Sequence, residues 1–371
     1  MLLTDQINLM LKKLPYELSP DAKKTSLINI CRSQIKYHIE NCEPYKNWYE
    51  SNNFKLPNNI SNLNEVPFIP SSVFKHLNLV SSDQKSKKIS SSGTTSQLKS
   101  NIFLDSKTSL NQTSALSKIL SSHLGKTRRP FFVIDFEPSS ENANNNEMSA
   151  RFAGMSGYLI AAKKRTYMLR EIDGRVVICK EALSELESTS KNGPIVVIGY
   201  TYMLWQYMKK YDDSNQQIKL HKDSKIIHFG GWKKLSSEKI KKEELNYNIS
   251  QHFKTNIENI LDIYGFTEQL GTVYVATGDN GCLVTDYSHV IVRDTSSFEE
   301  VEDGKLGFLQ FISCLPESYP GFSILNDDIG YISHREIDNN GREIIHFKVS
   351  DRLKEAEARG CGDTLPEEYY I

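Results

Sequence analysis

The sequence predicts an α/β protein in which a doubly wound parallel sheet is followed by a smaller β subdomain. Between residues 130 and 245, apolar strand-like runs alternate with helix-like segments, the pattern of a parallel sheet covered by helices. After Gly271 the pattern changes to short strands separated by turns. The length of 371 residues suggests about two domains at roughly 150 residues each and can bury a large core.

The first fifty residues are predicted to be helical, because Ile28, Cys31, Ile35 and Ile39 recur at the spacing of one helix face. Residues 52–64 are polar and rich in asparagine, so they are expected to form a connector. The following elements are expected from their apolar patterns. Strands are expected at 130–136, 174–179, 195–200 and 225–229, and helices at 148–162, 180–188, 203–211 and 236–245. In the β subdomain, strands are expected at 273–276, 290–293, 307–313, 330–334 and 343–349.

Composition excludes several classes of function. Lys and Arg total 45 against 46 Asp and Glu, a balance that gives no reason to expect a nucleic-acid or anionic-membrane partner. No apolar run approaches the ~20 residues of a membrane span, and residues 1–13 do not resemble a signal peptide. The six cysteines form no CxxC pair. We therefore expect free thiols in a cytoplasmic protein.

A Ser/Thr/Gly loop is the first stretch that could carry chemistry. Its phosphate-binding candidates are Ser91, Ser92, Gly93, Thr94, Thr95 and Lys99. Hydroxyls, backbone N–H groups and one flexible glycine suit phosphate oxygens, and a lysine can neutralise their charge. The loop lacks P-loop spacing, so a flexible polar loop without a ligand is an equally good interpretation.

Two glycine-containing turns are further candidates. Gly230 and Gly231 follow a predicted strand, and ligands bind at the carboxyl ends of parallel strands. Glycines there would let the backbone approach a flat ring. Tyr264, Thr267 and Glu268 combine a stacking ring, a hydroxyl and a carboxylate. For each turn alone, a plain connection between elements is the stronger interpretation.

Acidic and basic groups near the C-terminus complete the candidates. Asp327 and Asp328 precede a glycine, and could bind a ribose diol or a cation, or simply form a turn. Ser350 to Lys354 includes Arg352 and could equally be a charged, solvated helix. Cys361 lies between two glycines, with Arg359 two residues before it. Such a thiol is little hindered and a nearby cation favours its thiolate, although neighbouring acids oppose this.

The order of these motifs resembles the adenylate-forming superfamily, and within it the acyl-protein synthetase (LuxE-like) family of the bacterial luminescence fatty-acid reductase complex. The loop departs from the superfamily pattern at Ser96 and Leu98. The closer resemblance covers nearly the whole chain. It is carried by Val66 to Pro70 with Phe74 and Lys75, Ser91 to Thr94, Gly230 to Lys233, Ser318 to Pro320, Asp327 to Gly330, and Gly360 with Cys361.

The resemblance implies that the chain activates a carboxylic acid, fatty acids being the family expectation, with ATP and Mg²⁺. It implies an adenylate-forming domain at 1–349 and, at 350–371, a hinge and tail in place of a C-terminal domain. Binding roles fall on the loop residues and Lys99, on Gly230, Gly231, Tyr264 and Thr267, and on Asp328 and Arg352 at the ribose. Glu268 would serve Mg²⁺, and Lys99, Glu268 and Cys361 would be catalytic.

The acceptor of the acyl group has two possible identities. By resemblance, Cys361 takes the acyl group as a thioester and passes it to an acyl reductase. Alternatively, the chain is an adenylating ligase that delivers the acyl group to CoA or to a carrier-protein thiol. A non-catalytic scaffold subunit with the same fold is a third reading. The presence of Lys99, Glu268, Asp328 and Arg352 at the motif positions argues against it.

Overall fold

The structure of the chain, a computed structural model, describes residues 1–84, 86–91, 98–138, 150–172, 175–212, 218–232 and 240–352. Its α-helices are α1 (Leu3–Lys12), α2 (Pro20–Asn41), α3 (Glu43–Ser51), α4 (Val73–His76), α5 (Ser106–Leu124), α7 (Ala150–Tyr158), α8 (Lys180–Asn192), α9 (Thr201–Asp212) and α10 (Lys242–His252). Its strands are β1 (Ile69–Pro70), β2 (Lys87–Ser90), β3 (Asn101–Leu104), β4 (Arg129–Phe136), β5 (Ala162–Ile172), β6 (Arg175–Ile178), β7 (Val196–Tyr200), β8 (Lys225–Phe229), β9 (Ile260–Tyr264), β10 (Tyr274–Thr277), β11 (Cys282–Leu283), β12 (Ser288–Arg293), β13 (Gly307–Ser313), β14 (Ser323–Ile337) and β15 (Glu343–Arg352). Among its 3₁₀ helices are η3 (Leu159–Ala161) and η6 (Thr267–Gln269).

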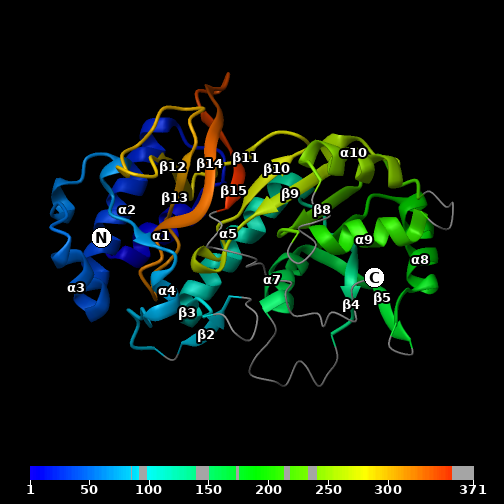
Figure 1. Ribbon diagram of the computed structural model, residues 1–371, viewed down its shortest axis with the longest axis horizontal. Coiled ribbons are helices and arrows are strands. Elements are labelled where there is room, and N and C mark those ends of the chain that lie inside the picture. Colours follow the sequence, from blue (N-terminus) through cyan, green and yellow to red (C-terminus); the bar gives the residue numbers. More distant parts are fainter. Residues whose placement is uncertain are drawn as a thin grey trace.

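A parallel sheet forms the half of the molecule that contains α8, α9 and α10 (Figure 1). Strands β5, β4, β7, β8 and β9 lie side by side in that order, and each pair is parallel. Every residue of β7 is buried. Because successive side chains point to opposite faces of a sheet, both faces of β7 must be covered. The predicted α/β class is therefore confirmed.

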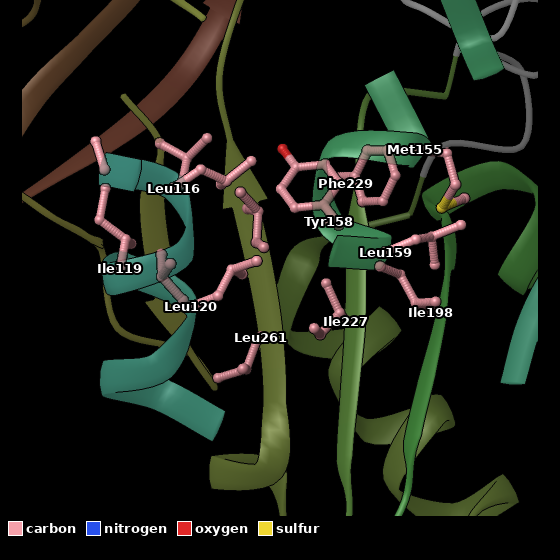
Figure 2. Close-up of a cluster of buried hydrophobic side chains, with 14 of the residues drawn as sticks. Leu116, Ile119, Leu120, Met155, Tyr158, Leu159, Ile198, Ile227, Phe229 and Leu261 are labelled. Carbon is pink, nitrogen blue, oxygen red and sulfur yellow. The ribbon is translucent and has the colours of Figure 1, made fainter. Parts of the chain in front are cut away.

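Helices α5 and α7 cover one face of this sheet. Figure 2 shows Leu116, Ile119 and Leu120 of α5 near Leu261 of β9, in one cluster of buried side chains. The same cluster includes Met155, Tyr158 and Leu159 from α7 and η3, with Ile198, Ile227 and Phe229 from the strands. Helices α9 and α10 contact each other and the strands of the parallel sheet. This packing fixes the ends of β7, β8 and β9, where the candidate site lies.

The predicted strands after Gly271 are present, and they continue the same hydrogen-bonded sheet. From β9 the order runs through β10, β11, β15, β14 and β13 to β12, with antiparallel pairing throughout. These strands enclose a second core that includes Tyr274, Phe311 and Phe347. Tyr264 of β9 packs against Phe311, with ring centroids 5.5 Å apart. The sheet therefore curves until β13 and β14 face the end of β9.

Strands β14 and β15 are longer than predicted. Their length excludes the turn that was the alternative for Asp327 and Asp328, and the helix that was the alternative for Ser350 to Arg352. β14 begins at Ser323 rather than Gly330, so Asp327 and Asp328 lie within a strand. β15 continues to Arg352, where a charged helix was the alternative. The adjacent acids suggested a turn because they are unfavourable in strands. Here the long antiparallel pairing with β15 outweighs that preference.

Other elements also differ from prediction, and neither α5 nor β9 was predicted. β5 was not predicted, because the strand is largely exposed and polar, and only Met168 and Leu169 of its residues are buried. The helix expected at 236–245 is α10, which begins at Lys242; residues 233–239 lie outside the described part of the chain. Its second half buries Asn246, which donates to the carbonyl of Gly278 at 3.0 Å. Because polar residues lie on its buried face, apolar spacing did not predict the second half of this helix.

The N-terminal helices were predicted correctly. α1 buries Leu3, Ile7, Met10 and Leu11 on one face. α2 starts where the Ser19 hydroxyl caps the helix by accepting the N–H of Ala22, a common N-terminal stabilisation. None of the helices within the described ranges has the length and apolar character needed to cross a lipid bilayer.

Candidate active site

The candidate site lies at the carboxyl ends of the central parallel strands. β7 ends at Tyr200, β8 at Phe229 and β9 at Tyr264. The register aligns these ends, because Tyr200 pairs with Phe229, and Phe229 pairs with Ile263. Consequently Thr201, Gly230 and Tyr264 emerge at one edge of the sheet, the usual location of ligand sites in open α/β sheets.

The turn after β8 requires glycine at its first position. Gly230 has φ +75°, and a Cβ there would stand 3.2 Å from Cδ1 of Tyr200, so other residues would be strained. The Thr201 hydroxyl donates to the carbonyl oxygen of Gly230 at 2.9 Å. A Cβ at Gly231 would meet no described atom within 4 Å. The Thr201 hydroxyl therefore fixes the backbone of Gly230, and the described part of the chain leaves space for a ligand beside Gly231.

A series of polar and charged side chains, buried or half-buried, supports this turn. Nδ1 of His228 lies 3.0 Å from the Thr201 hydroxyl and 3.7 Å from Oδ1 of Asp262. Asp262 is also 3.0 Å from Nζ of Lys242. Burial lowers the pKa of His228. Burial alone would raise the pKa of Asp262, but Lys242 and His228 hold it below its ordinary value. The sequence offered no pattern linking Thr201, Asp262 and Lys242.

Tyr264 and Asp328 are brought into direct contact. The Tyr264 hydroxyl donates to Oδ2 of Asp328 at 2.5 Å, and Nδ2 of Asn326 donates to both, at 2.8 and 3.1 Å. Asp328 is buried. Asp327 instead lies 3.9 Å from Nζ of Lys75, as expected for neighbours on opposite faces of a strand. Of the two adjacent acids, Asp328 is therefore the one that faces the end of β9.

The expected partner of Asp328 is placed opposite it by strand pairing. Asp328 and Arg352 are paired residues in the register of β14 and β15. The ring of Tyr264 is half-buried and stacks on Phe311 with an interplanar angle of 27°. Phe311 therefore occupies one face of the ring that the sequence assigned to stacking.

Glu268 and Thr267 lie in η6, directly after β9, and both are buried. The carbonyl oxygen of Glu268 accepts the Tyr319 hydroxyl at 3.0 Å. β3 packs against η6. This contact brings the hairpin of β2 and β3 to the carboxylate, so two motifs separated in sequence share one region.

The β2–β3 hairpin carries the Ser/Thr/Gly loop at its tip. The backbone N–H of Ser91 donates to the carbonyl of Ser100, and the N–H of Ser100 donates to the Ser91 hydroxyl, each at 2.9 Å. Lys99 is exposed. Ser92, Gly93, Thr94 and Thr95 lie outside the described residues, as does Cys361. In the described part of the loop, Ser91 and Ser100 are therefore joined by two hydrogen bonds, and Lys99 is next to Ser100.

The arrangement combines a glycine turn, a tyrosine–aspartate pair and a buried glutamate around one sheet edge. A carboxylate held by two donors can accept hydroxyls of a sugar, and a second carboxylate can hold a hard cation. The structure brings Gly230, Tyr264 and Asp328 together as the motif order predicted. Asn326 joins them through its bonds to Tyr264 and Asp328, and Tyr319 contacts Glu268. Neither residue was assigned a role from the sequence.

Comparison with known proteins identifies a family over almost the whole chain. The model of the family described as "Acyl-protein synthetase, LuxE" matches residues 3–370. The chain is 22% identical over 359 residues to a long-chain-fatty-acid–luciferin-component ligase of Vibrio harveyi, covering 96% of this chain and 91% of that protein. It is 25% identical to the protein of the same name from Aliivibrio fischeri, covering 94% and 89%.

Solved structures show the same fold. A 2-hydroxyisobutyryl-CoA ligase in the postadenylation state superimposes with a TM-score of 0.69 at 12% identity, over 91% of this chain and 69% of that one. An open conformation of that ligase, bound to 2-HIB-AMP and CoA, also gives 0.69 at 12% identity, over 92% and 77%. The fold is therefore that of adenylate-forming ligases.

Proposed function

The chain belongs to the acyl-protein synthetase family, LuxE, and from this premise we propose that it uses ATP to convert a fatty or other carboxylic acid into an acyl-adenylate. The observation that carries the proposal is the contact between Tyr264 and Asp328 beside Gly230. It gathers an aromatic ring, a ribose-binding carboxylate and a glycine turn where a nucleotide binds in such sheets. The relatives are named as ligases of long-chain fatty acids.

In the first step a carboxylate oxygen of the acid attacks the α-phosphorus of ATP. A new P–O bond forms, the bond to the β-phosphate oxygen breaks, and pyrophosphate leaves. Gly230 and Gly231 would flank the adenine and Tyr264 would stack on it. Asp328 and Arg352 would hold the ribose hydroxyls. Groups that bind the phosphates and stabilise the developing charge accelerate this step.

The phosphates are assigned to the hairpin loop and to Glu268. Ser91, Ser92, Gly93, Thr94, Thr95 and Lys99 would bind them, with Thr267 near the carboxylate. Glu268 would supply a hard oxygen ligand of the kind that Mg²⁺ prefers, since Mg²⁺ is usually held by one or two carboxylates together with substrate phosphates. When bound, Mg²⁺ neutralises charge on the phosphates.

Lys99→Ala is expected to lower ATP-dependent pyrophosphate release by about 100-fold, the scale seen when one charge-stabilising donor is removed. Lys99 is exposed, so the melting temperature should stay within about 2 °C, as for ordinary surface substitutions. Lys88→Ala is the matched control, because Lys88 is an exposed lysine on β2 of the same hairpin. Equal activity in the two variants would remove Lys99 from the phosphate site.

In the second step we propose that Cys361 accepts the acyl group. Its thiolate attacks the acyl carbon, a C–S bond forms, the C–O bond to AMP breaks, and AMP leaves. The thioester would then pass its acyl group to a partner enzyme, an acyl reductase. Gly360 and Gly362, which flank Cys361 in the sequence, have no side chains that would hinder the sulfur, and a thiolate is the nucleophilic form of cysteine.

Labelled fatty acid and ATP are expected to leave a hydroxylamine-sensitive label on the wild-type chain. Cys361→Ala should carry less than about a tenth of that label while retaining pyrophosphate release, because adenylation precedes the thiol. Cys361→Ser should behave alike, unless a serine ester accumulates. Cys282→Ala is the control and should keep the label, since burial raises the pKa of the Cys282 thiol to about 12 and leaves little thiolate.

The label decides between the two possible acceptors. If Cys361→Ala still carries a stable thioester, another thiol on the chain is the acceptor. If neither protein is labelled but added CoA or carrier protein becomes acylated, the chain is an adenylating ligase for a separate thiol. Either result would overturn the role proposed for Cys361 and leave the adenylation step in place.

A further inference from the structure

Residues 314–322 join β13 to β14 and are buried along their whole length. Buried backbone without regular secondary structure must find partners for its polar groups. At the centre of this connection lie Ser318, Tyr319 and Gly321. Both Ser318 and Tyr319 have no exposed surface. What these residues contact therefore shows what the connection holds.

On one side the connection contacts the short helix that carries Glu268. The Tyr319 hydroxyl donates to the carbonyl oxygen of Glu268 at 3.0 Å. Nε2 of Gln269 donates to the carbonyl oxygen of Gly321 at 2.8 Å. A Cβ on Gly321 would stand 2.6 Å from the Glu268 carbonyl oxygen and 2.3 Å from the Tyr319 ring. The backbone of η6 is thus in direct contact with Tyr319 and Gly321.

On the other side the same connection holds the hairpin of the Ser/Thr/Gly loop. The Ser318 hydroxyl donates to the carbonyl of Phe103 in β3 at 2.8 Å. The backbone N–H of Ser318 donates to the Thr108 hydroxyl at 3.0 Å, and its carbonyl accepts the N–H of Ser81 at 2.8 Å. Two adjacent residues, Ser318 and Tyr319, therefore tie the hairpin and Glu268 to one buried point.

We infer that Tyr319 is a positioning residue, which sets the place of the Glu268 carboxylate relative to the phosphate-binding hairpin. This inference rests on the proposed function, in which Glu268 holds Mg²⁺ and the hairpin holds the phosphates. A cation shared between a carboxylate and phosphate oxygens requires near-ideal octahedral geometry when it is Mg²⁺. A bond that fixes the peptide of the ligand residue therefore governs metal affinity.

The Tyr319 hydroxyl can be removed without changing the packing of its ring. The ring packs edge-on against Phe74, with centroids 6.3 Å apart, and phenylalanine preserves that packing. Nε2 of Gln112 approaches the hydroxyl at 3.4 Å. Loss of the hydroxyl frees the Glu268 carbonyl to move, which displaces the carboxylate.

Tyr319→Phe is expected to weaken Mn²⁺ binding about 10-fold in the presence of a non-hydrolysable ATP analogue, measured by electron paramagnetic resonance. Affinity for the analogue without metal should change less than about twofold. Tyr287→Phe is the matched control: Tyr287 has no exposed surface and donates to the carbonyl of Lys13 at 2.6 Å. Both variants lose one hydroxyl–carbonyl hydrogen bond made by a tyrosine without exposed surface, so both should melt at similarly reduced temperatures.

The comparison of the two variants is decisive. Equal Mn²⁺ affinity in Tyr319→Phe and Tyr287→Phe would make Tyr319 a purely structural residue and overturn the inference, while the proposed function would stand. If the wild-type chain binds no nucleotide, both are overturned. Gly321→Ala offers a second route to the same displacement, because its Cβ would press on the Glu268 carbonyl. A folded Gly321→Ala chain with unchanged metal affinity would also count against the inference.

Discussion

Asp328→Ala is expected to weaken binding of a non-hydrolysable acyl-AMP mimic about 100-fold, whereas Asp327→Ala should change it by less than about threefold. The 100-fold loss corresponds to roughly 2.8 kcal/mol, within the range for one or two hydrogen bonds to a charged group. Asp328 is buried at the end of β9 and accepts from Tyr264 and Asn326, so its carboxylate is held where the proposal places the ribose. Isothermal titration calorimetry measures both affinities.

Asp327 is the natural control, because it is the adjacent residue of the same type. It faces Lys75 across the other side of β14. Thermal unfolding of both variants should accompany the titration, since Asp328→Ala also removes the acceptor of Tyr264. Undiminished affinity in a folded Asp328→Ala chain would take the ribose away from Asp328. A loss confined to Asp327→Ala would transfer the role to its neighbour.

Acidification from pH 7.5 to pH 5 is expected to cost about 2 kcal/mol of unfolding free energy for each of two histidines, the buried His38 and the half-buried His289. Burial lowers the pKa of each to about 3, from about 6.5 in an unfolded chain. For His289, repulsion by Lys23 and Arg335 adds to this effect. Below pH 6.5 the unfolded state binds more protons, so stability falls as pH drops towards 3.

His38→Gln should make stability less dependent on pH by about 2 kcal/mol over the same interval. Nδ1 of His38 lies 2.8 Å from the Ser81 hydroxyl, and the ring stacks on Phe322. Burial alone, and no neighbouring charge, lowers the pKa of His38. Urea denaturation at both pH values gives the free energies. His334→Gln, on an exposed part of β14, is the control and should behave as wild type. An unchanged pH dependence in His38→Gln would show that folding does not lower the pKa of His38.

The parts of the fold that the sequence predicted are those with a single physical cause. Val196–Tyr200 is buried on both faces, and only a continuous apolar run satisfies that environment. β5 was missed because it is a largely exposed strand whose charged residues carry no apolar alternation. The second half of α10, beyond residue 245, was missed because the polar residues Asn246 and Ser250 lie on its buried face.

The sequence nominated candidate site residues where residue type and order sufficed, and their roles stay predictions. Gly230, Tyr264 and Asp328 form short local motifs, and the structure brings them together. The bond between Tyr319 and the Glu268 carbonyl joins residues 51 positions apart. The sequence around a buried tyrosine does not indicate which group its hydroxyl will bond. Such contacts can therefore be found only from the three-dimensional packing.

The pairing of β1 with β14 has a consequence for the newly made chain. Ser71 donates its N–H to the carbonyl of Leu325, and Thr4 donates to Glu317. At ~5–20 residues per second, roughly 13–63 s separate the synthesis of such partners. During this time α1 and α2 can pack against each other and α1 against α5, and β4 to β9 can already assemble. The N-terminal segment with β1 is therefore expected to complete its packing only after β14 has been made.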